Sequence, residues 1–113
     1  MEYDVELTLK VISHDKQTWT FGNLELKLPF APTIGIALSF NDSTTPPITN
    51  IVYSLNGNIF KCYAVHEIEY DDEDLEFWVE KYKKKGWRNF DDLYVGYIEG
   101  GVEVKEGVFK KFD

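Results

Sequence analysis

Residues 67–88 read EIEYDDEDLEFWVEKYKKKGWR, and this segment sorts its charges by position. Seven of its first ten residues are acidic, whereas five of its last eight are basic. The apolar side chains between them recur at helical spacing: Leu75, Trp78, Val79 and Tyr82. This pattern is typical of an amphipathic helix whose acidic start and basic end suit the helix dipole. The sequence therefore predicts one helix over about residues 72–85, closed by Gly86.

The rest of the chain carries strand patterns. Apolar and polar residues alternate from Tyr3 to Val11, which predicts a half-buried strand. A second apolar run begins at Trp19 and resumes on the opposite parity after Gly22, which indicates a bulge or a turn at that glycine. Further strands are expected over residues 34–40, 48–55, 59–70, 93–98 and from 102 onward.

The connections are rich in turn-forming residues. Residues 41–47 (NDSTTPP) are the clearest loop, and Asn56-Gly57 predicts a type I′ hairpin turn. Because strands come in a run with one late helix, the sequence predicts a single α+β domain over residues 1–113. We expect a strongly bent antiparallel β-sheet or a small open β-barrel, with the amphipathic helix packed on it.

Composition narrows the range of partners. The net charge of −8 argues against nucleic acid and against an anionic membrane surface, which both select basic patches. The same charge favours a basic protein partner. Cys62 is the only cysteine, so no disulfide forms within the chain, as is usual in a reducing cytoplasm. The acidic N-terminus lacks a signal-peptide pattern, and no apolar run is long enough for a membrane helix. We therefore expect a cytoplasmic protein.

The acidic cluster has three interpretations. A calcium loop requires alternating ligands and a central glycine, and residues 71–74 have neither. Helix capping by Asp71 or Asp72, with further acids favouring the positive end of the dipole, is the favoured explanation. The functional alternative is a surface that docks a basic partner. The contact residues of that surface would be Asp72, Glu73, Glu76 and Trp87.

Two tempting combinations are disfavoured. Trp87 beside the basic run can stack on a nucleic acid, but a solvated helix end with Trp87 turned into the core suits the acidic chain better. Cys62 and His66 would sit about 13 Å apart along one strand, too far for a thiolate–imidazole pair. We expect Cys62 in the core and His66 at the sheet margin. With no phosphate loop, zinc-ligand spacing or nucleophile elbow, the sequence predicts no catalytic residues, metal or cofactor.

Three functions remain open. The leading hypothesis is a non-enzymatic binding or adaptor domain that acts through protein–protein contact. It would either neutralise a basic partner, as an inhibitor or immunity protein does, or self-associate. The alternative is a small-molecule-binding barrel or minor enzyme with an aromatic-lined pocket, in which Tyr63 and His66 would be the polar groups. The third is a structural subunit of a larger assembly, such as a phage particle.

Overall fold

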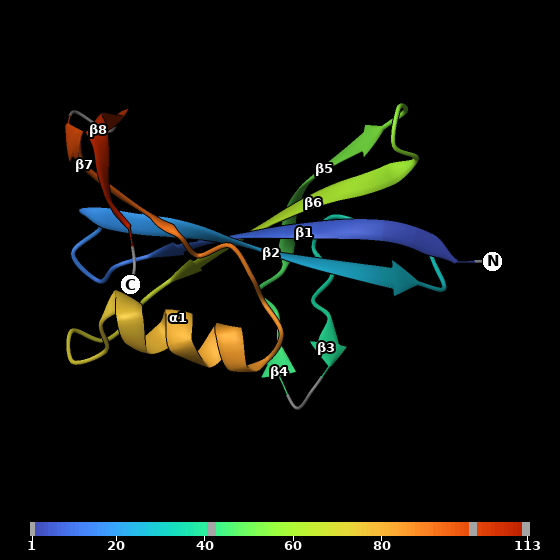
Figure 1. The fold of residues 1–113 in the computed structure, drawn as a ribbon, viewed down its shortest axis with the longest axis horizontal. Coiled ribbons are helices and arrows are strands. Elements are labelled where there is room, and N and C mark those ends of the chain that lie inside the picture. Colours follow the sequence, from blue (N-terminus) through green and yellow to red (C-terminus); the bar gives the residue numbers. More distant parts are fainter. Residues whose placement is uncertain (1, 41–42, 100–101, 112–113) are drawn as a thin grey trace.

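The computed structural model describes residues 2–40, 43–99 and 102–111, with side chains described as far as residue 96. One helix and eight strands follow one another in this part of the chain (Figure 1). Their order is β1 (Tyr3–Ile12), β2 (Thr18–Leu28), β3 (Ser39–Phe40), β4 (Ser43–Thr44), β5 (Ile48–Ser54), β6 (Ile59–Glu67), α1 (Leu75–Lys84), β7 (Asp92–Glu99) and β8 (Val102–Lys111). No helix in these residues is both long and apolar enough to span a membrane.

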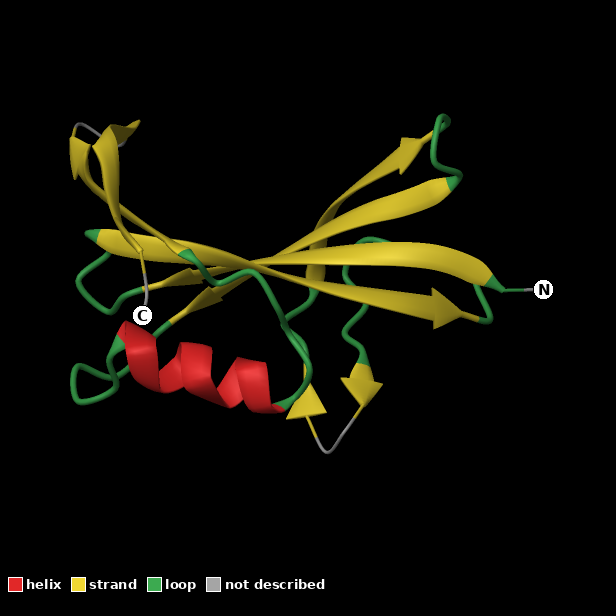
Figure 2. Cartoon of the chain, in the orientation of Figure 1, coloured by secondary structure: helices red, strands yellow, loops and turns green. Residues whose placement is uncertain are grey.

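Six of the strands form one twisted sheet in the order β5-β6-β1-β2-β7-β8, and β3 pairs with β4 in a separate small sheet. The α+β class is thereby confirmed. The sheet stays open, with β5 and β8 at its edges, so the barrel form is not adopted (Figure 2). Every neighbouring pair in the large sheet is antiparallel except β1 and β6, which run parallel. That pair was not foreseen, because a parallel pair joins strands distant in sequence.

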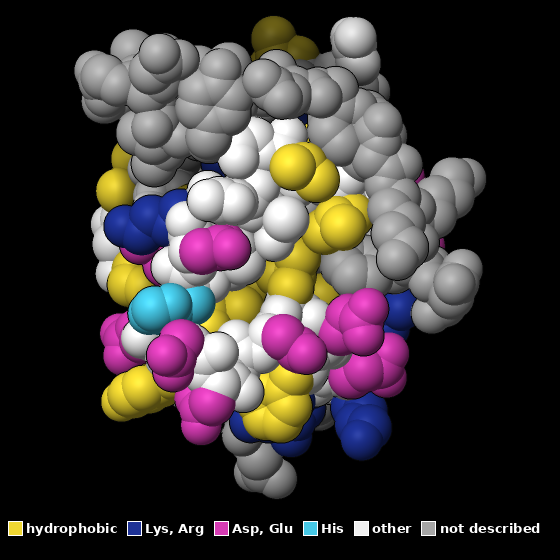
Figure 3. All heavy atoms as spheres, turned by 90° about the vertical axis from the view of Figure 1, so that its left-hand side faces the viewer, with side chains coloured by type: hydrophobic (Ala, Val, Ile, Leu, Met, Phe, Trp, Pro, Cys, Tyr) yellow, Lys and Arg dark blue, Asp and Glu magenta, His cyan; other side chains and the backbone are white. Residues whose placement is uncertain are grey.

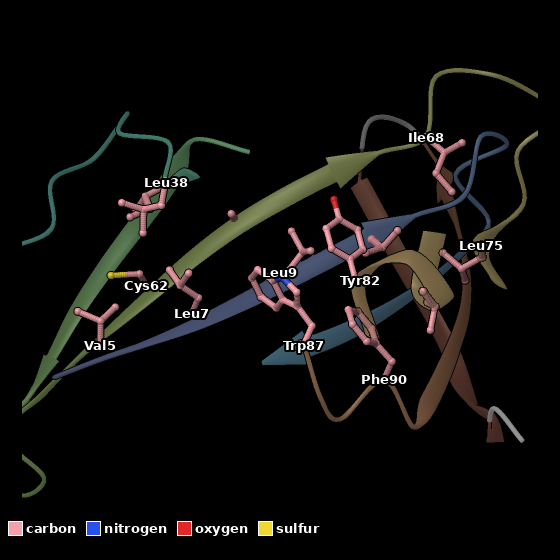
Figure 4. Packing of buried hydrophobic residues seen from close by; sticks show 14 of the residues in the cluster. Val5, Leu7, Leu9, Leu38, Cys62, Ile68, Leu75, Tyr82, Trp87 and Phe90 are labelled. Carbon is pink, nitrogen blue, oxygen red and sulfur yellow. The ribbon is translucent and has the colours of Figure 1, made fainter. Parts of the chain in front are cut away.

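The core lies between the sheet and α1. The alternating side chains predicted for the first strand are confirmed, since Val5, Leu7, Leu9 and Val11 are each at most 2% exposed. Facing them, α1 buries Leu75, Val79 and Tyr82 of the predicted apolar stripe, and the fourth member, Trp78, is half-buried against the cluster. Figure 4 shows Tyr82, Trp87 and Phe90 grouped with Leu9 in this cluster.

Gly22 interrupts neither the strand nor its pairing. The β1–β2 register is continuous from Tyr3 opposite Leu28 to Ile12 opposite Trp19, so the expected bulge or turn is wrong. The apolar pattern changes from odd to even positions at Gly22 because the apolar side chains before Gly22 and those after it occupy opposite faces of one strand. Gly22 itself makes room for Phe90: a Cβ there would lie 2.1 Å from the Phe90 ring.

The segment after β2 departs from the prediction of a strand over residues 34–40. Only Ser39–Phe40 is extended, because Gly35 adopts a φ of 92° and breaks the run. The turn at Gly35 instead clasps the start of β5. Gly35 N–H donates to Ile48 O at 2.8 Å, and Ile48 N–H donates to Ile36 O at 2.8 Å. Of the predicted 41–47 loop, residues 43–44 form β4, and 41–42 lie outside the described residues.

The β5–β6 hairpin is confirmed, but its turn is longer than predicted. Ser54 pairs with Ile59, so the loop holds four residues rather than two. The left-handed residue is Asn58, with a φ of 51°, and neither Asn56 nor Gly57 has a positive φ. The predicted type I′ turn is therefore wrong, although the asparagine-rich and glycine-containing loop still supplies the residue that tolerates a left-handed backbone.

Both ends of α1 are set by single residues. Asp74, not Asp71 or Asp72, is the N-cap, because its Oδ1 accepts the Phe77 backbone N–H at 2.8 Å. The helix therefore begins later than predicted. Its end matches the prediction, since Gly86 follows the C-cap with a φ of 100°, the left-handed conformation that glycine adopts without strain.

Candidate functional site

An acidic and aromatic surface surrounds the start of α1. We call it the acidic–aromatic surface, and it consists of Tyr70, Asp71, Asp72, Glu73, Asp74, Glu76 and Phe77. Two of its members are large apolar rings left in contact with water: Tyr70 is 62% exposed and Phe77 is 46% exposed. Figure 3 views this end of the molecule and shows acidic side chains gathered around apolar ones. Exposed aromatic side chains surrounded by charged side chains are a common feature of protein-binding surfaces.

The segment between Ile68 and Leu75 is held at its two ends by these buried side chains, which serve as its anchors. Ile68 is 4% exposed and donates its backbone N–H to Ile12 O at 2.9 Å, which ties the end of β6 to β1. Leu75, at the first turn of α1, is 7% exposed. Between the anchors, Tyr70 is the one residue with a large apolar side chain, and the others are acidic. The Tyr70 carbonyl accepts the Glu73 backbone N–H at 3.2 Å. The chain therefore makes a tight turn that presents its carboxylates and the Tyr70 ring to solvent.

Shallow hollows flank this turn. One, of about 530 Å³, is lined by Tyr70, Asp72, Glu73, Asp74 and Phe77. Another, also about 530 Å³, lies between the turn and the β1–β2 connection, where it includes Asp15 and Glu76. Glu73 and Asp74 line both hollows. The acidic groups are therefore positioned to contact a ligand that crosses from one hollow to the other. No cluster of His, Cys, Asp and Glu among the described residues is arranged to hold a metal ion.

The aromatic rings on α1 already contact a cation. Lys81 Nζ lies 4.8 Å from the Phe77 ring centroid and 4.6 Å from that of Trp78. The two rings meet edge to face, with centroids 5.8 Å apart. An ammonium group over two ring faces is a cation–π arrangement. The cation is supplied by the same helix, since Lys81 lies four residues after Phe77 and three after Trp78.

His66 forms a second polar cluster with side chains of α1. Its Nδ1 lies 2.6 Å from the Tyr82 hydroxyl, and its ring meets Trp78 edge to face at 4.4 Å. Burial raises the pKa of Tyr82 to about 12, so the phenol keeps its proton. Burial also lowers the pKa of His66, and the nearby Glu69 carboxylate opposes that shift. A neutral His66 that accepts from Tyr82 carries its own proton on Nε2.

Stability should fall as His66 becomes protonated. Its pKa in the folded protein lies below the reference value of 6.5, so below that pH the unfolded chain binds the proton more readily. The free energy of unfolding should therefore decrease between about pH 7.5 and pH 5. Urea unfolding at several pH values measures this, and His66→Gln should show a shallower decrease than the wild type.

A matched variant separates burial from the hydrogen bond. Tyr82→Phe removes the hydroxyl that faces His66 but keeps the ring that covers it. Since burial is the largest cause of the lowered His66 pKa, this variant should keep most of the wild-type pH dependence. Identical pH dependence in the wild type and His66→Gln would contradict the assignment.

The structure separates the residues that the sequence proposed as sites. Asp72 and Glu76 are exposed and Glu73 is half-buried; Glu76 lies in the first turn of α1 as expected, whereas Asp72 and Glu73 lie in the turn before the helix. Trp87 is 3% exposed in the core, so it is not a docking residue, and its interpretation as a core side chain is the correct one. The reason is that Gly86 turns the chain back toward the sheet, where the Trp87 ring packs at 5.8 Å from that of Tyr82.

Tyr63 and His66 do not share a pocket. They are three residues apart on β6, so their side chains point to opposite faces of the sheet. Cys62 is buried, and its pKa is raised by burial, as befits a core thiol. His66 contacts Tyr82 rather than Cys62. The proposed aromatic-lined pocket therefore has no support at these residues.

Two residues of the surface, Tyr70 and Phe77, were missed. The sequence carried a signal for Phe77, since it lies outside the helical stripe of Leu75, Val79 and Tyr82 and so must point away from the sheet. The predicted strand over residues 59–70 included Tyr70, but β6 ends at Glu67.

Comparison of the chain with protein-family models, curated proteins and solved structures gave no match. We therefore infer function from the chemistry of the surfaces themselves.

Proposed function

We propose that this protein is a binding domain whose acidic–aromatic surface docks a basic segment of a partner protein. The observation that carries the proposal is that the exposed Tyr70 and Phe77 side chains line one hollow together with Asp72, Glu73 and Asp74. Exposed rings supply contact area, and the carboxylates supply charge that selects a cationic partner. An inhibitor or adaptor that neutralises a basic protein would use such a surface.

The recognised group is best described as an arginine or lysine side chain. The Phe77 and Trp78 rings already hold the ammonium group of Lys81 within 5 Å of their centroids, at 4.8 and 4.6 Å. A partner cation entering the adjoining hollow would meet the Phe77 ring together with carboxylates on the turn. A net charge of −8 adds long-range attraction, which raises the association rate and makes it sensitive to salt.

Charge reversal at two surface positions should weaken binding to an arginine-rich peptide. In the Glu73→Lys, Glu76→Lys double variant, two attractions become repulsions, and we expect a loss of roughly tenfold in affinity, since each exposed pair contributes up to about 1 kcal/mol. The dependence of affinity on salt should flatten as well. Isothermal titration calorimetry at low and at physiological ionic strength measures both. Asp74 is left intact because it caps α1.

The matched control is Glu2→Lys with Glu6→Lys, which changes the net charge by the same amount on β1 and the residue before it. Equal loss of affinity in the two double variants would mean that only the overall charge matters, and the proposed surface would be wrong. Phe77→Ala tests the aromatic contribution without any change in charge. It should lower affinity at physiological ionic strength, where the attraction between charges is screened.

A further inference from the structure

One stretch of this highly charged chain carries no charge at all. Residues 43–60 contain no Asp, Glu, Lys or Arg, although such residues make up 28% of the chain. The stretch forms β4, β5, the loop that leads to β6 and the first two residues of β6. Within it, Val52 is 49% exposed, Tyr53 is 44% exposed and Leu55 is 80% exposed. This neutral segment therefore presents three apolar side chains to solvent within four residues.

This stretch also includes an edge of the large sheet. β5 pairs with β6 on one side and has no neighbouring strand on the other among the described residues. Edge strands are commonly blocked by charges, prolines or bulges. In β5 those devices are confined to its start: Pro47 precedes it, and the pairing with β6 shifts register between Ile48 and Asn50. The turn at Gly35 also binds Ile48 there.

The later part of β5 is less protected against pairing with another strand. The Asn50 side chain accepts the Ile51 backbone N–H at 3.0 Å, and no charged side chain or proline follows it in the strand. Val52 lies opposite Lys61 and Tyr53 opposite Phe60, so the two exposed apolar side chains occupy opposite faces of the sheet. A strand added at this edge would therefore find an apolar contact on each face as well as backbone hydrogen-bonding groups.

We propose that the β5 edge pairs with β5 of a second copy of this chain, in antiparallel orientation, to form a two-fold symmetric dimer. Antiparallel pairing of identical strands is self-complementary, so the contact closes at two subunits. A neutral edge offers no charge with which to select a basic or acidic partner. Two copies that each carry a net charge of −8 repel each other least where the facing segments hold no charge.

Side chains next to the edge favour the same arrangement. Tyr53 packs edge to face on Phe60 with ring centroids 4.7 Å apart, and Phe60 packs on Tyr3 at 6.0 Å. These three rings form a row that runs from β1 across β6 to the β5 edge. In the dimer the row would continue into its symmetry-related copy, because Tyr53 lies at the end of each row.

The dimer leaves the acidic–aromatic surface free. The β5–β6 loop and the start of α1 lie toward opposite ends of the long axis of the molecule (Figure 1). A dimer would therefore present two such surfaces at once, so that a partner with two basic segments gains from effective concentration. The inference goes beyond the proposed function, and either can fail without the other.

Sedimentation velocity across a range of protein concentrations tests the pairing. We expect the wild type to show a monomer–dimer equilibrium, and Val52→Lys to raise the dimer dissociation constant at least about tenfold, as a lysine on an edge strand opposes pairing. The control is Val65→Lys, on the inner strand β6 and the same sheet face, with Val65 36% exposed. It adds the same charge and should leave the dissociation constant unchanged.

Each contrary result is informative. A wild type that remains monomeric at every concentration would overturn the proposal, as would equal weakening by Val52→Lys and Val65→Lys. If overall charge alone governed association, both lysine variants would strengthen it, because each reduces the net charge. Amide hydrogen exchange in the wild type is an independent measurement. The Tyr53 N–H points to the same side of β5 as the Ile51 N–H, which is bonded to the Asn50 side chain and not to β6, so Tyr53 should gain protection as protein concentration rises. Unchanged exchange at Tyr53 would also overturn the pairing.

Discussion

Replacing Gly22 with alanine should destabilise the protein by about 3 kcal/mol, the upper part of the range for overpacked cores. The added Cβ would lie 2.1 Å from Phe90 Cζ and 2.4 Å from two further ring carbons. Phe90 is 0% exposed, and Gly22 pairs with Leu9 in the middle of β1, so neither ring nor strand can move freely. Thermal unfolding followed by circular dichroism should show a drop in melting temperature on the order of 10 °C.

Two companion variants make the Gly22 result specific. Gly57→Ala is the matched control, because the nearest atom to its Cβ would be Ile59 Cγ2 at 3.4 Å, an ordinary contact at an exposed loop. We expect it to change stability by less than about 0.5 kcal/mol. Phe90→Leu combined with Gly22→Ala should recover part of the loss, since a smaller side chain relieves the clash. Purely additive losses would show that Phe90 is not the obstacle.

Truncating Leu9 to alanine should cost about 3–5 kcal/mol, the upper part of the range measured for buried leucines. Leu9 is 0% exposed at the centre of β1, where strands pair on both sides and α1 covers the face. Because β2, β6 and α1 all hold the backbone around Leu9, the surrounding side chains cannot move in to fill the cavity. Most of the van der Waals contacts of the leucine are therefore not replaced. Chemical denaturation with a linear fit gives the free energy directly.

Ile34→Ala is the control for Leu9→Ala, since isoleucine has the same number of carbons but Ile34 is 67% exposed in the loop before β3. We expect it to change the free energy of unfolding by no more than about 0.5 kcal/mol. Comparable losses in the two variants would mean that the sheet face against α1 is not the centre of the core.

The sequence was most informative where the pattern is local. The alternation along β1 and the apolar stripe of α1 predicted which side chains are buried, because a side chain's direction follows from its position in a strand or helix. Gly86 likewise ended the helix as its conformational freedom implies. The N-cap was predicted at Asp71 or Asp72 rather than at Asp74, because several neighbouring aspartates can cap the helix. The burial of Leu75 decides which of them does.

The candidate surface was predicted only in part. The acids Asp72, Glu73 and Glu76 were expected within the start of the helix, but only Glu76 lies in α1, and Asp72 and Glu73 belong to the turn before it. Their aromatic companion was predicted as Trp87, which is buried, whereas Phe77 is the exposed ring. Both aromatic residues follow the same acidic turn, and only the packing of α1 on the sheet decides which of them reaches water.

The sequence by itself determined the α+β class, the β5–β6 hairpin and the amphipathic helix, because these depend on spacing within a short segment. Tertiary structure decided the parallel pairing of β1 with β6, the close approach of Phe90 to Gly22 and the contact of His66 with Tyr82. Each of these contacts joins residues distant in the chain or depends on what covers a sheet face. Their energy comes from burial, which no local pattern specifies until the strands have been ordered in space.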